Sequence, residues 1–262
     1  MQPTIAQLIQ WSHEAGQILR EGFGRQHQIQ MKGSTDLVTE MDRQSEALLL
    51  ERILGAFPDH AIYTEESGRL NGQNSSCWYI DPIDGTVNYA HALPIFSVSI
   101  AYAEGGQVLL GVVYDPMRDE TFSAEKGGGA FLNGRPITVA QTGQLINALL
   151  ATGFPYNLDK GFKPDNLDLF ASFARRARGM RRLGSAALDI CYVACGRFDG
   201  YWEPVLYPYD MAAGALIASE AGAKVTRLDG SLNLLTSPCD LVVANPRLHE
   251  LMLDVIRQND NN

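Results

Sequence analysis

Apolar residues recur at helical spacing in two stretches near the start of the chain. Residues 3–22 and 39–56 each place apolar side chains about one helical turn apart, and this period predicts two amphipathic helices. Pro58 follows the second stretch closely and is typical of a helix end. The apolar positions that carry the pattern are Ile5, Leu8, Ile9, Ile18 and Leu19, then Leu48, Leu49, Ile53 and Leu54.

The pattern then changes to short apolar or alternating runs, which predict strands. These runs cover residues 77–80, 95–102, 108–114, 121–124 and 130–132. Three consecutive glycines, Gly127 to Gly129, separate the last two runs. They could cradle a phosphate, but no helix start and no lysine–serine pair follows them. A hairpin turn is the favoured interpretation.

Helices and strands alternate in the rest of the chain. The pattern predicts strands at 149–152, 200–202, 225–228 and 241–244, and helices at 165–178, 185–194, 211–221 and 246–257. Because both types are mixed throughout, we expect layers of helix and sheet around a core. A chain of 262 residues with 45% hydrophobic content can bury such a core. We predict one domain, residues 1–262, with halves of about 1–145 and 146–262.

The net charge of −9 argues against non-specific binding to nucleic acid or anionic membranes. The four cysteines form no CxxC pair and are interpreted as small buried hydrophobes of a reducing compartment. No apolar run reaches membrane-spanning length and no signal peptide is visible, so the sequence predicts a cytoplasmic protein. One run of basic residues is a local exception to the acidic balance: Arg175, Arg176, Arg178, Arg181 and Arg182.

Two aspartates three residues apart end a hydrophobic strand. The segment 78–86 reads Trp-Tyr-Ile-Asp-Pro-Ile-Asp-Gly-Thr, in which the proline fixes one backbone angle and the glycine permits a sharp turn. Asp81 and Asp84 would repel one another there unless they are protonated or bridged by a cation. Mg²⁺ binds through carboxylates and substrate phosphate. Thr86 would begin a short helix, whose free N–H groups favour a phosphate. Taken alone, the segment could also be an ordinary turn.

Two further groups of acids add to this segment. Glu65 and Glu66 follow an apolar stretch, and Asp210 stands at the start of an apolar helix. Taken alone, the glutamates could belong to a solvated loop and Asp210 could be a plain helix N-cap.

Together these segments resemble the inositol monophosphatase family of magnesium-dependent, lithium-sensitive phosphatases. The resemblance rests on Glu-Glu at 65–66, on the segment 78–89, on Gly-Ser-Ala-Ala at 184–187 and on Tyr-Asp-Met-Ala-Ala-Gly at 209–214. It runs from Lys32 to about Pro246. It implies an α/β (α+β) fold, a layered α-β-α-β-α sandwich of the sugar-phosphatase type, and a homodimer. Tyr209 and Ser185 stand where the family often has tryptophan and threonine, which puts only the fine substrate preference in doubt.

Carried over position by position, the resemblance implies two or three Mg²⁺ ions per site. The first ion would be held by Glu65, Asp81 and the carbonyl of Ile83. The second would be held by Asp81, Asp84 and Asp210, and Glu65 would help to hold a weaker third. These residues are the metal ligands that the resemblance predicts.

The resemblance also implies roles for other residues. Thr86, oriented by Asp42, would position the attacking water, and the backbone amides of Gly85 and Thr86 would receive the phosphate. Lys32 would lie near the metals. The alcohol part of the substrate would face Asp84, Gly184, Ser185, Ala186, Glu203 and Asp210.

The implied activity is hydrolysis of a small phosphate monoester by a metal-activated water. Inositol monophosphate is the first candidate, since Glu203 is a good acceptor for polyol hydroxyls, although it could also be a solvated acid at a strand end. Fructose 1,6-bisphosphate, histidinol phosphate, galactose 1-phosphate and 3′-phosphoadenosine 5′-phosphate are alternatives. A phosphatase with an aspartate nucleophile is disfavoured. The loop of that class has its two aspartates two residues apart, whereas Asp81 and Asp84 are three apart. A regulatory binding protein on the same fold is the non-enzymatic alternative.

Overall fold

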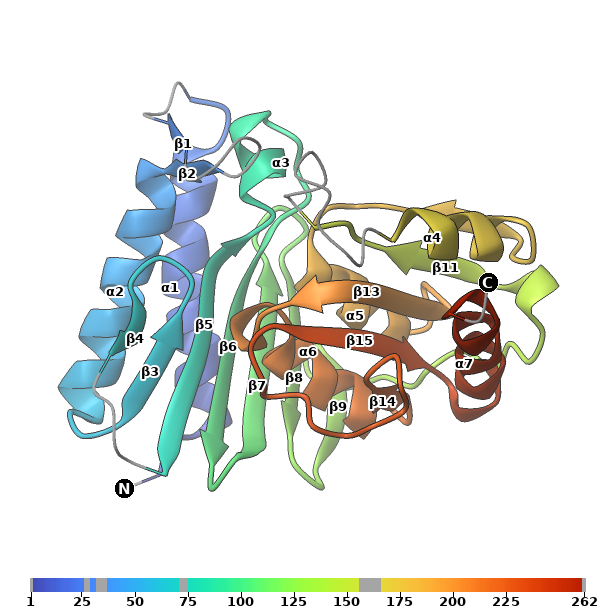
Figure 1. Cartoon of the computed structure of the whole chain (residues 1–262). Coiled ribbons are helices and arrows are strands. Elements are labelled where there is room, and N and C mark those ends of the chain that lie inside the picture. Colours follow the sequence, from blue (N-terminus) through green and yellow to red (C-terminus); the bar gives the residue numbers. More distant parts are fainter. Residues whose placement is uncertain (1, 26–28, 32–36, 71–74, 156–165, 261–262) are drawn as a thin grey trace.

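The structure is a computed structural model that describes residues 2–25, 29–31, 37–70, 75–155 and 166–260. Two helices, α1 (Ile5–Gly22) and α2 (Glu40–Ala56), form the first layer and pack against one face of a large sheet (Figure 1). Each begins after a threonine, Thr4 or Thr39, whose hydroxyl accepts a backbone N–H within a capping box. The helices predicted at 3–22 and 39–56 are confirmed.

Eight strands form the large sheet, in the order β10-β9-β8-β7-β6-β5-β3-β4. Neighbouring strands are antiparallel except β3 and β5, which run parallel. The strands are β3 (Ala61–Thr64), β4 (Gly68–Leu70), β5 (Ser76–Asp84), β6 (Ser97–Glu104), β7 (Gln107–Asp115), β8 (Glu120–Glu125), β9 (Gly129–Leu132) and β10 (Arg135–Pro136).

A five-stranded sheet, in the order β12-β11-β13-β15-β14, forms a second β layer. Helices α5 (Ala186–Ala194) and α6 (Pro208–Glu220) lie between the two sheets, while α4 (Leu167–Ala174) and α7 (Pro246–Asp260) cover the outer face of the smaller one (Figure 1). The layers therefore follow the order α-β-α-β-α, and the predicted fold class is confirmed. The strands are β11 (Leu149–Thr152), β12 (Gly179–Arg181), β13 (Gly200–Leu206), β14 (Lys224–Thr226) and β15 (Cys239–Ala244).

The shorter elements lie outside these layers. Strands β1 (Ile29–Met31) and β2 (Leu37–Thr39) form a small antiparallel pair. A single helical turn, α3 (Thr86–Ala90), follows β5, and a 3₁₀ turn covers Leu145–Asn147.

Three apolar clusters fill the spaces between the layers. One joins α1 and α2 to the large sheet around Trp11 and Trp78, one surrounds α5 and α6, and one joins the smaller sheet to α4 and α7 around Trp202. Helix α6 approaches the large sheet closely, because a Cβ at Gly111 of β7 would lie 2.9 Å from the carbonyl oxygen of Ala213. Helices covered on both sides are apolar all round, which explains the apolar composition of α5 and α6.

Several predicted boundaries are wrong. The strand at 77–80 continues to Asp84, the strand at 95–102 lies at Ser97–Glu104, and the helix at 211–221 begins at Pro208. The helix at 165–178 is shorter, Leu167–Ala174, and the strand at 225–228 ends at Thr226. Strands β1, β2, β3, β4, β10 and β12 were not predicted, because each has only two to four residues without a clear apolar run and is ordered by its partner strand.

The glycine run is a hairpin turn. Strands β8 and β9 pair across it, with Glu125 opposite Gly129. The N–H groups of Gly127 and Gly129 donate to the Glu220 carboxylate at 2.8 and 2.9 Å. The turn thereby contacts the end of α6. The N–H groups that a phosphate would need already bind the Glu220 carboxylate.

In the part of the chain that the structure describes, no helix is long and apolar enough to cross a membrane. All four cysteines are free, and Cys191 and Cys239 are buried, in line with their interpretation as small hydrophobes.

Candidate active site

A β-bulge at the end of β5 brings two aspartates to one side of the large sheet. Asp81 pairs with Ser99 of β6 and Asp84 pairs with Ser97, so three steps along β5 match two along β6. Residues three apart in a regular strand point to opposite faces, and the extra residue restores a common face. Pro82 lies inside the irregular stretch, where its missing N–H removes no ladder hydrogen bond.

The chain turns sharply after the second aspartate. Gly85 has a φ of +102°, and a Cβ there would lie 3.0 Å from the carbonyl oxygen of Ile95 and 3.1 Å from that of Gly184. Glycine meets both demands, because it has no Cβ and adopts positive φ freely. The turn ends β5 and begins α3 at Thr86, as predicted.

The hydroxyl of Thr86 has two acceptors. Its Oγ1 lies 3.0 Å from Asp42 Oδ1 and 3.0 Å from the carbonyl oxygen of Ile83, and it can donate to either. Asp42 is fully buried at the start of α2, where its other oxygen accepts the N–H and the hydroxyl of Thr39 at 2.7 and 2.6 Å. With the hydroxyl proton engaged in this way, the lone pairs of Thr86 Oγ1 can accept a hydrogen bond from water.

Asp84 faces the start of α5. Its Oδ2 accepts the Ser185 hydroxyl at 2.5 Å and the Ala187 N–H at 2.8 Å, and its Oδ1 accepts the Ala186 N–H at 3.1 Å. Gly184 makes the turn into this helix with a φ of +84°. The structure therefore brings the predicted substrate residues of segment 184–186 against a predicted metal ligand.

Asp210 lies in the first turn of α6. The N-cap is Tyr207, whose N–H donates to Asp210 Oδ2 at 2.7 Å, and Pro208 occupies the first helical position. The interpretation of Asp210 as the N-cap is therefore wrong. Burial raises the pKa of Asp210 well above its ordinary value, against the hydrogen bond from Tyr207, and the negative charges of Glu65, Asp84 and Glu203 add to this rise.

A loop after β3 carries Glu65. Because β3 runs parallel to β5 and the Glu65 N–H donates to the carbonyl of Ile80 at 3.3 Å, Glu65 emerges beside Asp81. Buried Glu46 of α2 fixes this loop by accepting three hydrogen bonds, from the Thr64 hydroxyl at 2.8 Å, the Glu66 N–H at 3.1 Å and the Ser67 hydroxyl.

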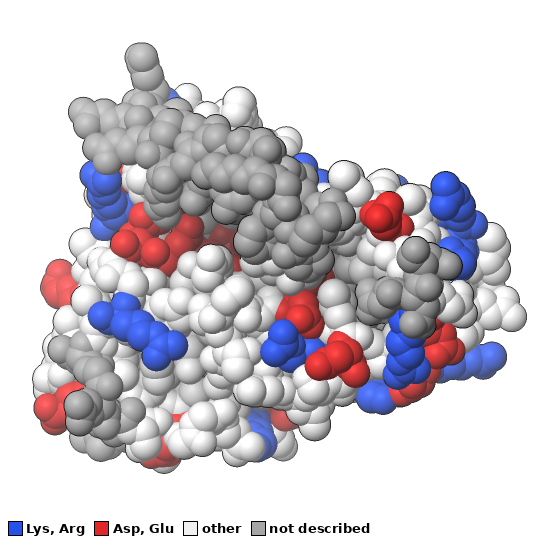
Figure 2. Space-filling model, viewed as in Figure 1, with Lys and Arg blue, Asp and Glu red and all other residues white. Residues whose placement is uncertain are grey.

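These carboxylates raise one another's pKa. Burial, followed by the negative charges of Glu65, Asp84 and Asp210, raises the pKa of Asp81 well above its ordinary value. Burial also raises the pKa of Asp84 to about 6, against the opposing effect of its hydrogen bonds from α5. Figure 2 shows acidic side chains gathered over the ends of β3 and β5. A buried group of like charges is stabilised by a cation or by protons.

The chemistry of this donor set suits Mg²⁺, because it consists of carboxylates and one backbone carbonyl without sulfur or nitrogen. As the side chains stand, no group of three or more His, Cys, Asp or Glu within the described residues is arranged to hold a metal ion. Asp84 in particular is turned toward the start of α5, where both of its oxygens accept hydrogen bonds. Ion binding would require the carboxylates to turn toward a common point.

Glu203 lies on β13 and is buried, so its interpretation as a solvated acid is wrong. The Tyr201 hydroxyl donates to its Oε2, and a Cβ at Gly153 would overlap its carboxylate. Burial raises the pKa of Glu203 to about 7; the hydrogen bond from Tyr201 opposes this rise, Asp84 adds to it, and the charge of Arg182 opposes it to a smaller extent. Glu203 therefore lies within electrostatic reach of the aspartate cluster.

Sequence reasoning missed residues that support the site through the backbone. The Ser45 hydroxyl donates to the carbonyl of Pro82 at 3.0 Å, and the Asn88 amide donates to the carbonyls of Ile95 and Leu183 at 2.8 Å each. Glu46 and Ser45 belong to no motif, and only Asn88 lies within a segment that carried the resemblance. Lys32, expected near the metals, lies outside the described residues.

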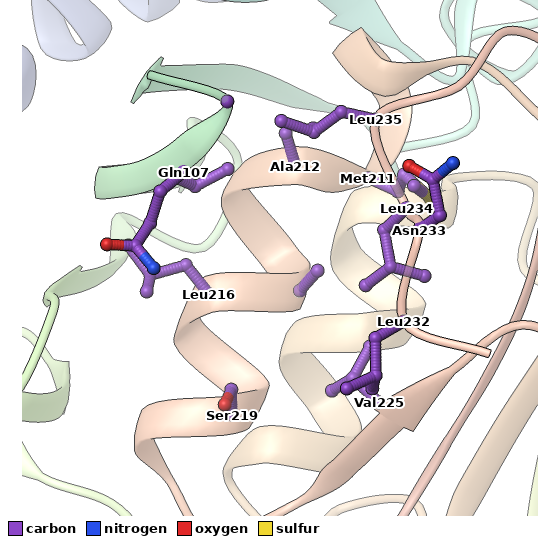
Figure 3. A pocket seen from close by; sticks show the side chains of 13 residues that line it. Gln107, Met211, Ala212, Leu216, Ser219, Val225, Leu232, Asn233, Leu234 and Leu235 are labelled. Carbon is purple, nitrogen blue, oxygen red and sulfur yellow. The ribbon is translucent and has the colours of Figure 1, made fainter. Parts of the chain in front are cut away.

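A cavity of about 350 Å³ lies beside α6. Figure 3 shows Leu216 of α6, Gln107 at the start of β7 and Leu232 of the loop before β15 around it. Met211 and Ala212, which directly follow Asp210, contribute to its wall. None of the predicted site residues lines this cavity.

Known proteins match the chain over nearly its whole length. The model of the Inositol monophosphatase family matches residues 1–261. The inositol-1-monophosphatase of Synechocystis sp. is 48% identical over 232 residues, which cover 87% of this chain and 79% of that protein. The Nus factor SuhB of Pasteurella multocida is 41% identical over 260 residues, 98% of this chain and 97% of that protein.

Solved structures agree with this assignment. The inositol monophosphatase of Anabaena (Nostoc) sp. superimposes with a TM-score of 0.84 at 40% identity, covering 96% of this chain and 95% of that one. The extragenic suppressor protein suhB of Bartonella henselae superimposes with a TM-score of 0.90 at 34% identity, covering 96% and 97%. The chain therefore belongs to the inositol monophosphatase family.

Proposed function

We propose that this chain is a magnesium-dependent phosphatase of small phosphate monoesters, with myo-inositol monophosphate as the first candidate substrate. Membership of the family supports a phosphatase of the inositol monophosphatase type. The observation that carries the proposal is the grouping of Asp81, Asp84 and Asp210 with Glu65 in a cluster whose negative charges raise the pKa of its members. Such a cluster needs a cation to stay ionised at neutral pH.

Five groups would hold the ions. Glu65, Asp81 and the carbonyl of Ile83 would bind one Mg²⁺, and Asp81, Asp84 and Asp210 would bind a second, with Glu65 also contributing to a weaker third. Bound Mg²⁺ supplies a water of lowered pKa and neutralises charge on the transferring phosphoryl group.

The residues of the chain position the reacting groups. Thr86 accepts a hydrogen bond from the attacking water, because its own proton points to Asp42 or to the carbonyl of Ile83. The N–H groups of Gly85 and Thr86, at the start of α3, face the phosphate and stabilise the charge that develops on it. No covalent intermediate with the protein is needed.

The alcohol part of the substrate lies against the start of α5 and against β13. Glu203 accepts hydrogen bonds from hydroxyl groups there, which favours a polyol. The same surface could take fructose 1,6-bisphosphate, histidinol phosphate, galactose 1-phosphate or 3′-phosphoadenosine 5′-phosphate. The residues assigned to it are Asp84, Gly184, Ser185, Ala186, Glu203 and Asp210.

A panel of these phosphate esters tests the proposal. Purified protein should release phosphate from at least one ester with Mg²⁺, and addition of a chelator should stop the release. Relatives named Nus factor SuhB favour a second candidate, a regulatory binding role on the same fold. Absence of turnover on every ester at saturating Mg²⁺ would contradict the enzymatic proposal and leave the regulatory role as the better account.

We propose two further properties on the strength of family membership. Lithium should inhibit turnover at millimolar concentration without competing with the substrate, and equal inhibition by potassium would contradict this. The protein should be a homodimer and lie in the cytoplasm. Sedimentation of the purified chain tests the dimer by its mass.

A further inference from the structure

The loop that enters α5 carries a cation at the alcohol side of the site. Arg182 lies two residues before Gly184, and the donors that follow Gly184 contact Asp84. The Arg182 guanidinium lies 5.3 Å from the centre of the Phe154 ring. Phe154 directly follows Gly153, which abuts the Glu203 carboxylate so closely that a Cβ would overlap it. The guanidinium is therefore adjacent to the wall that Glu203 forms.

In the described part of the chain, no carboxylate forms an ion pair with this guanidinium, and Arg182 is exposed. Its neighbours in the arginine run are engaged elsewhere: Arg176 donates to the carbonyl of Ser172, Arg178 to Asn147 Oδ1 and Arg181 to the carbonyl of Met180. The positive charge of Arg182 also acts on Glu203 and opposes the rise of its pKa.

We propose that Arg182 forms a subsite for a second anionic group on the alcohol part of the substrate, which raises kcat/KM for phosphate esters that carry such a group. The proposal rests on the proposed phosphatase function and narrows its substrate class. The charged side chains assigned to the alcohol side, Asp84, Glu203 and Asp210, are all acidic, so among the described residues Arg182 is the group there that attracts a second anion. A guanidinium presents a planar fork that binds phosphate through two hydrogen bonds, and stacking on an aromatic ring restrains it.

The test compares two substrates in three proteins. Values of kcat/KM are measured for fructose 1,6-bisphosphate and for inositol 1-phosphate with the wild type, with Arg182→Gln and with the matched control Arg181→Gln. Arg182→Gln should lower kcat/KM for the bisphosphate about tenfold or more, chiefly through KM, and change that for inositol 1-phosphate less than about threefold. Arg181→Gln removes the same charge one position away and should leave the ratio of the two values unchanged.

Two results would overturn the subsite: an unchanged ratio in Arg182→Gln, whether through equal loss or through no loss, or the same change of ratio in Arg181→Gln. Phe154→Leu, which keeps the charge and removes the ring, should produce a smaller loss in the same direction. If the wild type hydrolyses neither ester, the proposed function fails separately. Calorimetric titration with fructose 1,6-bisphosphate then decides the subsite, because Arg182→Gln must still bind the bisphosphate more weakly than Arg181→Gln does.

Discussion

Thr86 depends on a partner that lies 44 positions earlier in the chain. Asp42 has no freedom to turn, because its second oxygen accepts both the N–H and the hydroxyl of Thr39 in the capping box of α2. One buried carboxylate therefore begins a helix and also orients a hydroxyl at the end of β5. This dual use explains why an aspartate in the first turn of an ordinary amphipathic helix can belong to an active site.

Replacing Thr86 by valine should lower kcat at least about tenfold, since it removes the hydroxyl that orients the attacking water but keeps the side-chain shape. Thr121→Val is the matched control, because Thr121 lies on β8 and its hydroxyl contacts His13 of α1. Steady-state kinetics at saturating Mg²⁺ measure the effect. Retention of wild-type kcat in Thr86→Val would show that Thr86 does not position the water.

At the scale of elements, the sequence predicted the ends of β5 and the start of α3 only in part. The proline and glycine of segment 78–86 predicted a turn, and the family resemblance predicted that the aspartates lie close together. The bulge itself could not be predicted, because it is a mismatch of register between β5 and β6, and a register is a property of two strands. The same holds for β3 and β4, whose three- and four-residue runs are ordered by pairing with β5 and with each other.

The sequence also did not predict that α2 fixes the loop after β3, which carries Glu65. Glu46 is buried on α2, where a charged residue is rare, and it accepts hydrogen bonds from the last residue of β3 and from the loop that follows it. Its position has no motif, since the three donors are spread over residues 64–67 of another element. The signal that could have found it is a single acidic residue in the buried stripe of a helix.

Glu46→Gln should loosen the loop that carries Glu65. The substitution replaces one acceptor oxygen by an NH₂ group, which cannot accept the hydrogen bonds that Glu46 accepts from this segment. The concentration of Mg²⁺ at half-maximal turnover should rise severalfold, and kcat should recover at high Mg²⁺. Glu51→Gln on the same helix is the control, because the Glu51 side chain is exposed and its ion pair is with the neighbouring Arg52. A lowered kcat with an unchanged Mg²⁺ midpoint would assign Glu46 a different role.

At the scale of the whole molecule, His249 links stability to pH. The Thr226 hydroxyl donates to the carbonyl of Arg227, so His249 Nε2 carries the hydrogen that bonds Thr226 Oγ1 at 2.9 Å. Nδ1 is buried and has no partner among the described residues. Burial, and then the charge of Lys224, lowers the pKa of His249 to about 4. The unfolded chain therefore binds a proton on this residue at a higher pH than the folded chain does.

His249 should destabilise the fold progressively as the pH falls from about 6.5 toward 4, with no effect above this window. Buried carboxylates with raised pKa act in the opposite sense, so the prediction concerns a difference between two proteins. Melting temperatures of the wild type and of His249→Gln, recorded from pH 7.5 to pH 4.5, should converge as the pH falls. A gap between them that stays constant with pH would contradict the account.

At this scale the two sheets and the central helices bring carboxylates from separate parts of the chain into one cluster. Asp81 and Asp84 come from the large sheet, Asp210 from α6 between the sheets, and Glu65 from the loop after β3. The distance in sequence between these residues explains why composition and periodicity alone could not group them. Only the specific motifs did so.

The central claim, that this cluster binds Mg²⁺ and supports phosphate release, is tested most directly by one titration. Phosphate release from inositol 1-phosphate is measured against Mg²⁺ concentration for the wild type, for Asp84→Asn and for Asp254→Asn, an exposed control on α7. The account predicts no turnover in chelator, saturable activation in the wild type and the control, and a loss of more than about tenfold, or 1.4 kcal/mol, in Asp84→Asn without loss of thermal stability. Turnover that survives chelation, or Asp84→Asn with more than about a tenth of the wild-type kcat, would contradict it.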